Sequence, residues 1–243
     1  MSVEIVTYAN KSQGMFEELV NNEFGVPVKV LGWGTEWNGF NDKYRGMSEY
    51  LETKRDEDVV IFLDGFDTKI NKDPHGVVEL FEKCECKILV SRGPNPGDHL
   101  LGTCKDGIPA NSGMYMGYVK FLKVMIDEAL SYTCEDDQVN LNMVCKKHPF
   151  IKVDDTHLIF ENVSQLRSDK DSTAIFVSYP GKISFDRISR GFFEYTQFVY
   201  IYVVCLLVSS LAFYPKYKNQ ILTVLVGFLT FYIVFADKSC TLD

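Results

Sequence analysis

The chain has 243 residues, of which 46% are hydrophobic and 24% charged, and its formal net charge at pH 7 is -8. A chain of this size can bury the core of a good-sized globular domain. The acidic balance argues against a nucleic-acid-binding protein, which would present a basic face. Because residues 1–5 have neither a basic nor an apolar run, no secretory signal peptide is predicted.

The chain has seven cysteines, an odd number, and Cys84 and Cys86 are too close to pair easily with each other. This pattern predicts reduced thiols in a cytosol-facing protein rather than a disulfide framework. Half a zinc site at Cys84 and Cys86 is an alternative, but no second pair stands at ligand spacing.

The first third of the chain alternates between strand and helix signals. Val3–Tyr8 and Val28–Leu31 read as short apolar strands. Between them Ser12 is a suitable N-cap for a helix through residues 16–20. Apolar residues recur at helical spacing over 44–51.

The stretch 59–67 organises the rest of the chain. Its first five residues are all apolar, which is typical of a parallel strand buried on both faces. Asp64 and Asp67 follow at once, separated by Gly65 and Phe66. Ligands of open α/β sheets bind outside the carboxyl ends of the strands, so both carboxylates are candidate ligands for Mg²⁺ or Mn²⁺. An ordinary turn that closes the strand is the alternative.

The alternation continues to residue 177. A helix is expected around 77–81, a strand at 88–90, a long loop over 92–109 and a strand at 114–118. Helices over 121–130 and 139–144 follow, and then short strands at 151–153, 158–160 and 174–177. This order predicts an α/β fold with a parallel or mixed sheet and helices on its faces.

The C-terminal part has a different composition. Residues 198–213 and 221–236 are apolar runs without charge, each near the lower length limit for crossing a bilayer. They predict a two-helix transmembrane hairpin, with a buried or re-entrant pair as the alternative. Two domains are therefore expected, a catalytic one at 1–190 and a membrane anchor at 191–243. The predicted location is an integral membrane protein whose large domain faces the cytosol, although the lysines between the two runs partly oppose this orientation.

Four segments carry a resemblance to a known family. They are 31–37 (LGWGTEW), 60–67 (VIFLDGFD), 111–118 (NSGMYMGY) and 135–138 (EDDQ). In order and distance they resemble the glycosyltransferase domain of the procollagen lysyl hydroxylase/glycosyltransferase (PLOD) family, from about residue 3 to about residue 185. The resemblance implies a GT-A fold, a Rossmann-like and mostly parallel mixed sheet with flanking helices, that uses a UDP-sugar and Mn²⁺ (or Mg²⁺). The fused C-terminal hairpin is similar to that of homologues from large DNA viruses.

The resemblance also implies roles for individual residues. Asp64 and Asp67 would hold the metal ion, and Asp136 and Asp137 would orient sugar hydroxyls or act as a base on the acceptor. The donor would be bound by the residues Thr7, Trp37, Lys43, Asn111, Ser112 and Gly113. Each of these positions also has an ordinary structural interpretation, such as an acidic helix start at Asp136 and Asp137.

Two positions depart from the family pattern. The family's third metal ligand is a histidine, and Ser178 stands at that position, so metal affinity should be weaker. The second departure is Ser91-Arg92-Gly93, where the family tends to carry Ser-Ala-Glu. The family's hydroxylase domain is absent from this chain.

The predicted function is therefore a membrane-anchored, metal-dependent transfer of a hexose from a UDP-sugar to a hydroxyl acceptor on a protein or glycan. The alternative is a binding module with weakened or lost activity, tethered to a membrane. The sugar, the acceptor, the stereochemical outcome and the oligomeric state do not follow from the sequence.

Overall fold

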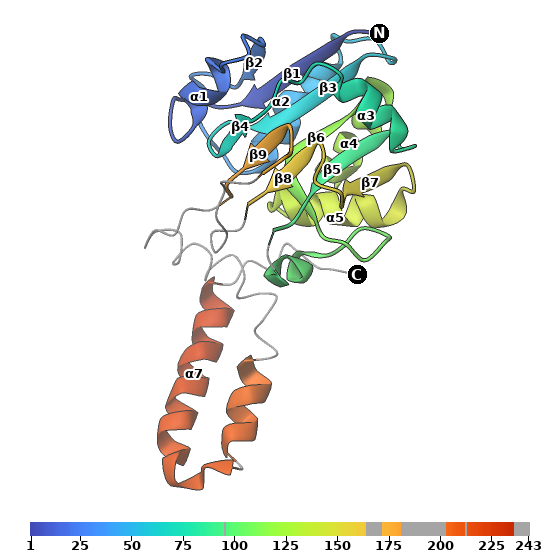
Figure 1. Cartoon of the computed structure of the whole chain (residues 1–243). Helices are drawn as coiled ribbons and strands as arrows, with labels where there is room; N and C mark the ends of the chain where they lie inside the picture. Colours follow the sequence, from blue (N-terminus) through green and yellow to red (C-terminus); the bar gives the residue numbers. More distant parts are fainter. Residues whose placement is uncertain (95, 164–171, 181–202, 212, 236–243) are drawn as a thin grey trace. The chain divides into compact units, whose positions relative to one another are not determined.

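The computed structural model describes residues 1–94, 96–163, 172–180, 203–211 and 213–235 (Figure 1). The described residues up to 180 belong to one compact unit, and those from 203 onward belong to a second. The predicted domain boundary at residue 190 lies outside the described residues and stays a prediction.

A six-stranded sheet forms the centre of the first unit, in the order β2-β1-β3-β6-β5-β7. Its strands are β1 (Val3–Tyr8), β2 (Val28–Leu31), β3 (Val59–Asp64), β5 (Ile88–Arg92), β6 (Ala110–Tyr118) and β7 (Ile151–Asp154). β6 runs antiparallel to its neighbours β3 and β5, and the other pairings are parallel. The α/β prediction with a mixed, mostly parallel sheet is confirmed.

Helices cover both faces of this sheet. They are α1 (Phe16–Val20), α2 (Asn41–Leu51), α3 (Val77–Lys83), α4 (Val119–Ser131) and α5 (Asp137–Lys147). α4 buries Leu122, Met125, Ile126 and Ala129, a stripe at helical spacing that faces the sheet. α2, α4 and α5 pack on one face, while α1 and α3 contribute to the core on the other.

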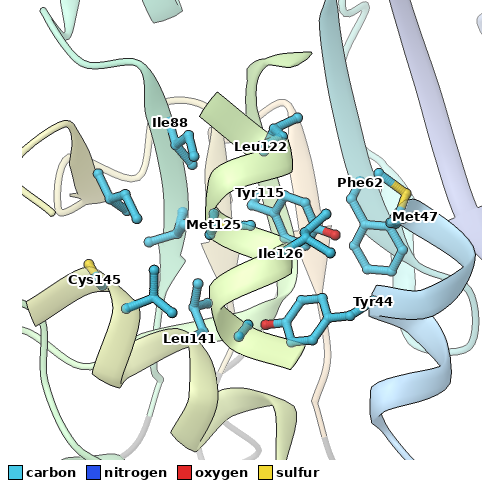
Figure 2. Packing of buried hydrophobic residues seen from close by; sticks show 14 of the residues in the cluster. Tyr44, Met47, Phe62, Ile88, Tyr115, Leu122, Met125, Ile126, Leu141 and Cys145 are labelled. Carbon is cyan, nitrogen blue, oxygen red and sulfur yellow. The ribbon is translucent and has the colours of Figure 1, made fainter. Parts of the chain in front are cut away.

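β3 is buried on both faces, as its apolar run predicted. Val60 and Phe62 belong to the core under α2, α4 and α5, and Ile61 and Leu63 belong to the core on the opposite face. This alternation follows from the two-residue period of a strand. Figure 2 shows the first core, where the Phe62 ring stacks on Tyr115 of β6 with a centroid separation of 4.8 Å. The strand is thus held rigidly up to Asp64.

A second, three-stranded sheet was not anticipated from the sequence. It has the order β4-β9-β8 and consists of β4 (Thr68–Ile70), β8 (Phe160–Asn162) and β9 (Phe176–Ser178). β8 and β9 each begin two residues later than the strands predicted at 158–160 and 174–177. β4 was not predicted, because three residues with a single aliphatic side chain give no periodic pattern. Its importance lies in β9, which ends beside Asp67.

The predicted loop over 92–109 contains a short 3-10 helix, Pro96–Leu101, and ends where β6 begins at Ala110. β6 therefore starts four residues earlier than the predicted strand and includes the Asn-Ser-Gly segment. The β5/β6 register shifts between Val90 and Ser91, which is a bulge opposite this segment. Bulges commonly re-aim side chains next to binding sites.

Cys104 and Cys145 form a disulfide that joins the segment before β6 to α5, and both side chains are buried. The prediction of reduced thiols is therefore wrong for these two residues. Sequence spacing could not pair them because they are 41 positions apart. Cys84 and Cys86 carry free thiols.

In the second unit, residues 203–211 are helical, and α7 (Lys218–Phe235) follows a 3-10 turn at Pro215–Tyr217. Among the described helices, none combines the length and apolar character that a membrane crossing requires. The predicted transmembrane hairpin is not confirmed, and its residues 198–202, 212 and 236 lie outside the described part of the chain.

Candidate active site

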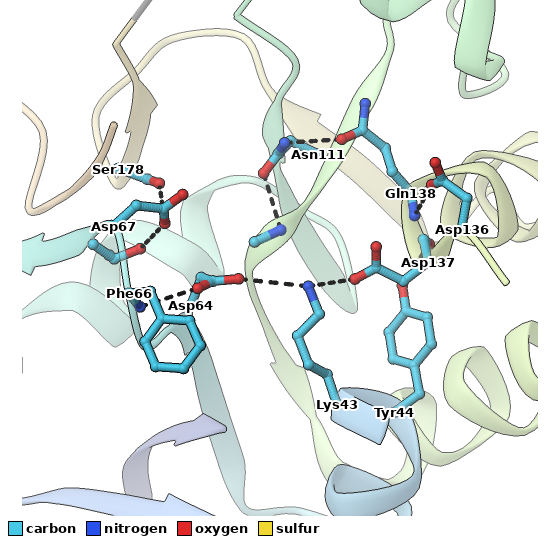
Figure 3. Close-up of polar contacts among 12 residues, drawn as sticks. Lys43, Tyr44, Asp64, Phe66, Asp67, Asn111, Asp136, Asp137, Gln138 and Ser178 are labelled. Carbon is cyan, nitrogen blue, oxygen red and sulfur yellow. Dashed lines mark hydrogen bonds and ion pairs between the residues drawn. The ribbon is translucent and has the colours of Figure 1, made fainter. Parts of the chain in front are cut away.

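A lysine and two carboxylates from three different elements meet at the carboxyl end of β3. Lys43, from the first turn of α2, places its Nζ 3.5 Å from Asp64 Oδ2 and 2.5 Å from Asp137 Oδ2. Figure 3 shows Lys43 between the two carboxylates. The lysine side chain is only 9% exposed. The structure thus brings together three residues that the sequence had nominated separately.

Burial alone would lower the pKa of Lys43, but the carboxylates of Asp137 and Asp64 raise it above its ordinary value. The lysine is therefore charged at neutral pH. Tyr44, the next residue of α2, donates its hydroxyl to the backbone oxygen of Asp137 over 3.0 Å. Two successive residues of α2 consequently hold the start of α5 in place.

Asp67 lies on the turn between β3 and β4. Its Oδ1 accepts a hydrogen bond from Ser178 Oγ at 3.0 Å and a longer one from Thr68 Oγ1 at 3.4 Å. Burial, together with the neighbouring Asp64 carboxylate, raises the pKa of Asp67 to about 7 against the opposing effect of these hydroxyls. Asp64 and Asp67 are therefore close enough to repel each other, which a bound cation would relieve.

The Asn-Ser-Gly segment lies beside Asp64. Asn111 Oδ1 accepts from the Gly113 backbone N–H at 2.9 Å, and Asn111 Nδ2 donates to Gln138 Oε1 at 2.9 Å. A side chain at position 113 would meet Asn111 Oδ1 at 2.9 Å and Asp64 Cβ at 3.7 Å, so glycine lets the strand pass close to the carboxylate. Ser112 is buried.

Asp136 and Asp137 have different tasks. Asp136 is the N-cap of α5, and its Oδ1 accepts from the backbone N–H groups of Gln138 and Val139. Asp137 points to Lys43 (Figure 3). Of the predicted pair, Asp137 is thus the one whose side chain joins the Asp64 cluster.

The predicted nucleotide residues are next to this cluster. Trp37 is 40% exposed and packs against the rings of Tyr8 and Phe40. Lys43 Nζ lies 5.5 Å from the centre of the Phe40 ring, so an aromatic series leads from Trp37 to the lysine. An exposed indole face is well suited to stacking on a flat base.

Thr7 is fully buried, and its Oγ1 has no hydrogen-bond partner in the described part of the chain. It lies under the Gly65 turn, where an added Cβ would come within 3.0 Å of that hydroxyl. A nucleotide contact by Thr7 would need this turn to move.

The oxygen atoms of Asp64 and Asp67 fit a hard divalent cation, because carboxylates are the ligands that Mg²⁺ and Mn²⁺ take in proteins. Within the described residues, no group of three His, Cys, Asp or Glu side chains is placed to bind a metal. His75 pairs with Asp73, and His148 pairs with Glu128. A cation at this site would thus depend on the two aspartates and on a substrate.

Sequence reasoning gave Gln138 no role, although it ends the 135–138 segment, and it missed Asn142 altogether. Gln138 holds Asn111, and its Nε2 is buried without a partner among the described residues. Asn142 bonds both backbone groups of Ala110, where β6 begins. The two are four residues apart on one face of α5, and that spacing was the available signal.

The chain is similar to proteins of a known family. The family model described as "PLOD GT domain" matches residues 1–175. Procollagen-lysine,2-oxoglutarate 5-dioxygenase 2 of Homo sapiens is 28% identical over 158 residues, which cover 56% of this chain and 21% of the relative. The multifunctional procollagen lysine hydroxylase and glycosyltransferase of Caenorhabditis elegans is 23% identical over 192 residues, covering 68% of this chain and 26% of that protein. The chain thus matches about a fifth to a quarter of the length of these relatives.

Two solved structures match this chain at low similarity. A glycosyltransferase involved in glycosylation of the major capsid of PBCV-1 is 13% identical, with a TM-score of 0.49 over 78% of this chain and 97% of that one. The galactosyltransferase LgtC, in complex with donor and acceptor sugar analogues, is 13% identical, with a TM-score of 0.46 over 77% and 92% of the two chains. Likeness at this level carries no inference about the substrate.

Proposed function

The chain belongs to the family of PLOD glycosyltransferase domains, and from this premise we propose that it transfers a hexose from a UDP-sugar to a hydroxyl acceptor on a protein or glycan, with a divalent cation. The observation that carries the proposal is the cluster of Lys43, Asp64 and Asp137 beside Asp67 at the carboxyl end of β3. Such a cluster is a suitable receptor for a diphosphate and its metal ion.

In this proposal Asp64 and Asp67 would hold Mn²⁺ or Mg²⁺. The ion supplies Lewis-acid neutralisation of the leaving UDP. Lys43 donates to a phosphate oxygen as a point charge. It is already charged in the protein because Asp137 and Asp64 hold its proton.

The sugar lies, in this proposal, between the Asn-Ser-Gly segment and the start of α5. Asn111 and Gln138 bond each other and orient the sugar hydroxyls with their remaining polar atoms. Asp137 either orders those hydroxyls or takes the proton of the acceptor hydroxyl once Lys43 turns to the diphosphate. Trp37 offers its exposed face to the uracil ring.

The test is a UDP-release assay over a panel of UDP-sugars, with and without Mn²⁺ or Mg²⁺, alongside thermal melting with UDP and metal. UDP with a cation should raise the melting temperature because both bind the folded state. Asp64→Ala and Asp67→Ala should abolish the shift and the activity, whereas Asp56→Asn, at an exposed carboxylate, should leave both unchanged. An unmoved melting curve of the unaltered protein would argue against the proposal.

Ser178 favours a second candidate, a glycan-binding module that has lost catalysis. Ser178 places a hydroxyl next to Asp67, and a hydroxyl is a weaker metal ligand than an imidazole. This candidate predicts no UDP release from any UDP-hexose and acceptor binding that survives chelation by EDTA.

Membrane attachment through residues 191–243 is part of the proposal. Its support is the exposure of large apolar side chains in the described part of this segment, such as Leu206, Phe213 and Val226. Flotation of the full chain with liposomes tests it. The Cys104–Cys145 disulfide weighs against the predicted cytosolic side, since disulfides persist in oxidising compartments. Protease protection in isolated membranes decides between the two sides.

A further inference from the structure

The side chain at position 178 is aimed at Asp67. β9 pairs with β4 in a register that sets Ser178 opposite Thr68, the residue after Asp67. The next residue, Tyr179, donates its backbone N–H to the Asp67 backbone oxygen at 2.8 Å. Ser178 itself is buried, at 1% exposure. Strand pairing thus fixes the group at 178 against the Asp67 carboxylate.

The Ser178 hydroxyl donates a hydrogen bond to Asp67 and has no nitrogen atom that could bind a metal ion. Ser178 Oγ and Thr68 Oγ1 both donate to the same oxygen of Asp67, Oδ1. Both hydroxyl contacts therefore fall on one carboxylate oxygen, and a cation would be bound by the other, Oδ2. Hydrogen-bond partners of this kind orient a ligating carboxylate and tune the affinity of the site.

The described side chains that hydrogen-bond to Asp67 therefore offer only oxygen atoms as metal ligands, and the nearby Lys43 is a charged ammonium that cannot ligate a cation. Oxygen-only sites suit Mg²⁺, Ca²⁺ and Mn²⁺, whereas imidazole suits the later transition metals. Mg²⁺ in particular binds through one or two carboxylates, with substrate phosphates and water completing its shell.

Resting on the function proposed above, we propose that this site is a Mg²⁺ site with little preference for Mn²⁺, and that Ser178 is the positioning residue that sets this selectivity. The hydroxyl acts through Asp67 and withholds the nitrogen ligand that would favour Mn²⁺, Co²⁺ or Zn²⁺. A residue with a purely structural role at 178 would affect folding without altering the ratio between metals.

The experiment measures metal affinity in the presence of saturating UDP, by calorimetry on the full chain with MgCl₂, MnCl₂, CoCl₂ and ZnCl₂. We expect the affinities for Mn²⁺ and Mg²⁺ to differ by less than about tenfold. Ser178→His should raise the ratio in favour of Mn²⁺ by about tenfold or more, the range that changes beside metal ligands produce. Ser178→Thr, which keeps the hydroxyl on a strand, should retain the original ratio.

Thr53→His is the matched control, because it adds an imidazole at an exposed hydroxyl residue. It should leave the ratio unchanged. A preference of the unaltered protein for Mn²⁺ by more than tenfold, or an unchanged ratio in a folded Ser178→His protein, overturns the inference. If Ser178→His does not fold, the metal series on the unaltered protein still decides.

Failure of the proposed function has a different signature. In that case a separate titration of UDP into the protein gives no binding heat in the presence of any of the four cations. A protein that binds UDP with Mn²⁺ but poorly with Mg²⁺ keeps the proposed function and loses only the inference about Ser178.

Discussion

Two clusters near the two ends of α2 contain a lysine and carboxylate partners, and they differ in burial and in charge balance. Lys54, just past the helix end, lies 2.8 Å from Glu4 Oε1, and Tyr50 donates to the same carboxylate. Lys43, at the helix start, lies between Asp64 and Asp137. The Lys43 side chain is 9% exposed, whereas Lys54 and Glu4 are 20% and 37% exposed.

The outer cluster around Lys54 is balanced, with one ammonium and one carboxylate. In the inner cluster, Lys43 is the ammonium on which the charges of Asp137, Asp64 and Asp67 all act. Surface pairs contribute little to stability, and buried carboxylates without enough cations oppose it. This difference in charge balance indicates that the inner cluster is suited to binding a further cation. The outer cluster holds the C-terminal end of α2 against β1.

The largest expected effect comes from Lys43→Met. This change leaves the buried Asp137 and the half-buried Asp64 without their ammonium, so the free energy of unfolding should fall by about 3–5 kcal/mol. Lys54→Met is the matched control at the outer cluster. Urea unfolding at pH 7, followed by circular dichroism, measures both. Equal losses in the two variants would contradict the contrast between the clusters.

The second-largest expected effect is a gain in stability, from Asp67→Asn. Burial raises the folded-state pKa of Asp67 to about 7, above its ordinary value of 3.8. Between these two pH values the folded protein holds more protons than the unfolded chain, so its stability falls as the pH rises. Asp67→Asn removes this pH-dependent loss of stability, because the amide does not titrate. The substitution should stabilise the metal-free protein at pH 8 by about 0.5–2 kcal/mol. It should also abolish the response to UDP and metal.

Thermal melting from pH 4.5 to 8.5 in EDTA checks this prediction. The melting temperature of the unaltered protein should fall as the pH rises from 4.5 to 8.5. The melting temperature of Asp67→Asn should fall by less over the same range. Asp56→Asn serves as the control at an exposed carboxylate. A less stable Asp67→Asn protein at pH 8 would show that the two aspartates do not oppose folding.

The smallest effect belongs to the outer cluster. Hydrogen bonds from Lys54 and Tyr50 lower the pKa of Glu4, so its contribution to stability is present at neutral pH and is lost on acidification. Glu4→Gln should cost less than about 1 kcal/mol at low salt. Urea unfolding in 0.05 M and 0.5 M NaCl measures it, and the cost should shrink at high salt. A cost as large as that of Lys43→Met would remove the distinction between the clusters.

The disposition of Asp64 and Asp67 could be predicted because β3 is buried on both faces. Such a strand needs consecutive apolar residues, and the first polar ones mark its end. The candidate site residues Lys43, Asn111 and Asp137 came from motif resemblance rather than from local pattern. Their contacts with one another had no local signal, since each stands on a different element.

The sequence by itself determined the alternation of strands and helices, the limits of β1 and β2, and the position of the two aspartates, because periodicity and burial act over a few neighbouring residues. Tertiary structure alone decided the reversed direction of β6, the small sheet, the Cys104–Cys145 disulfide and the placing of Ser178 against Asp67. The last two join residues 41 and 111 positions apart. Contacts at that separation depend on how whole elements pack, and short stretches of sequence do not encode them.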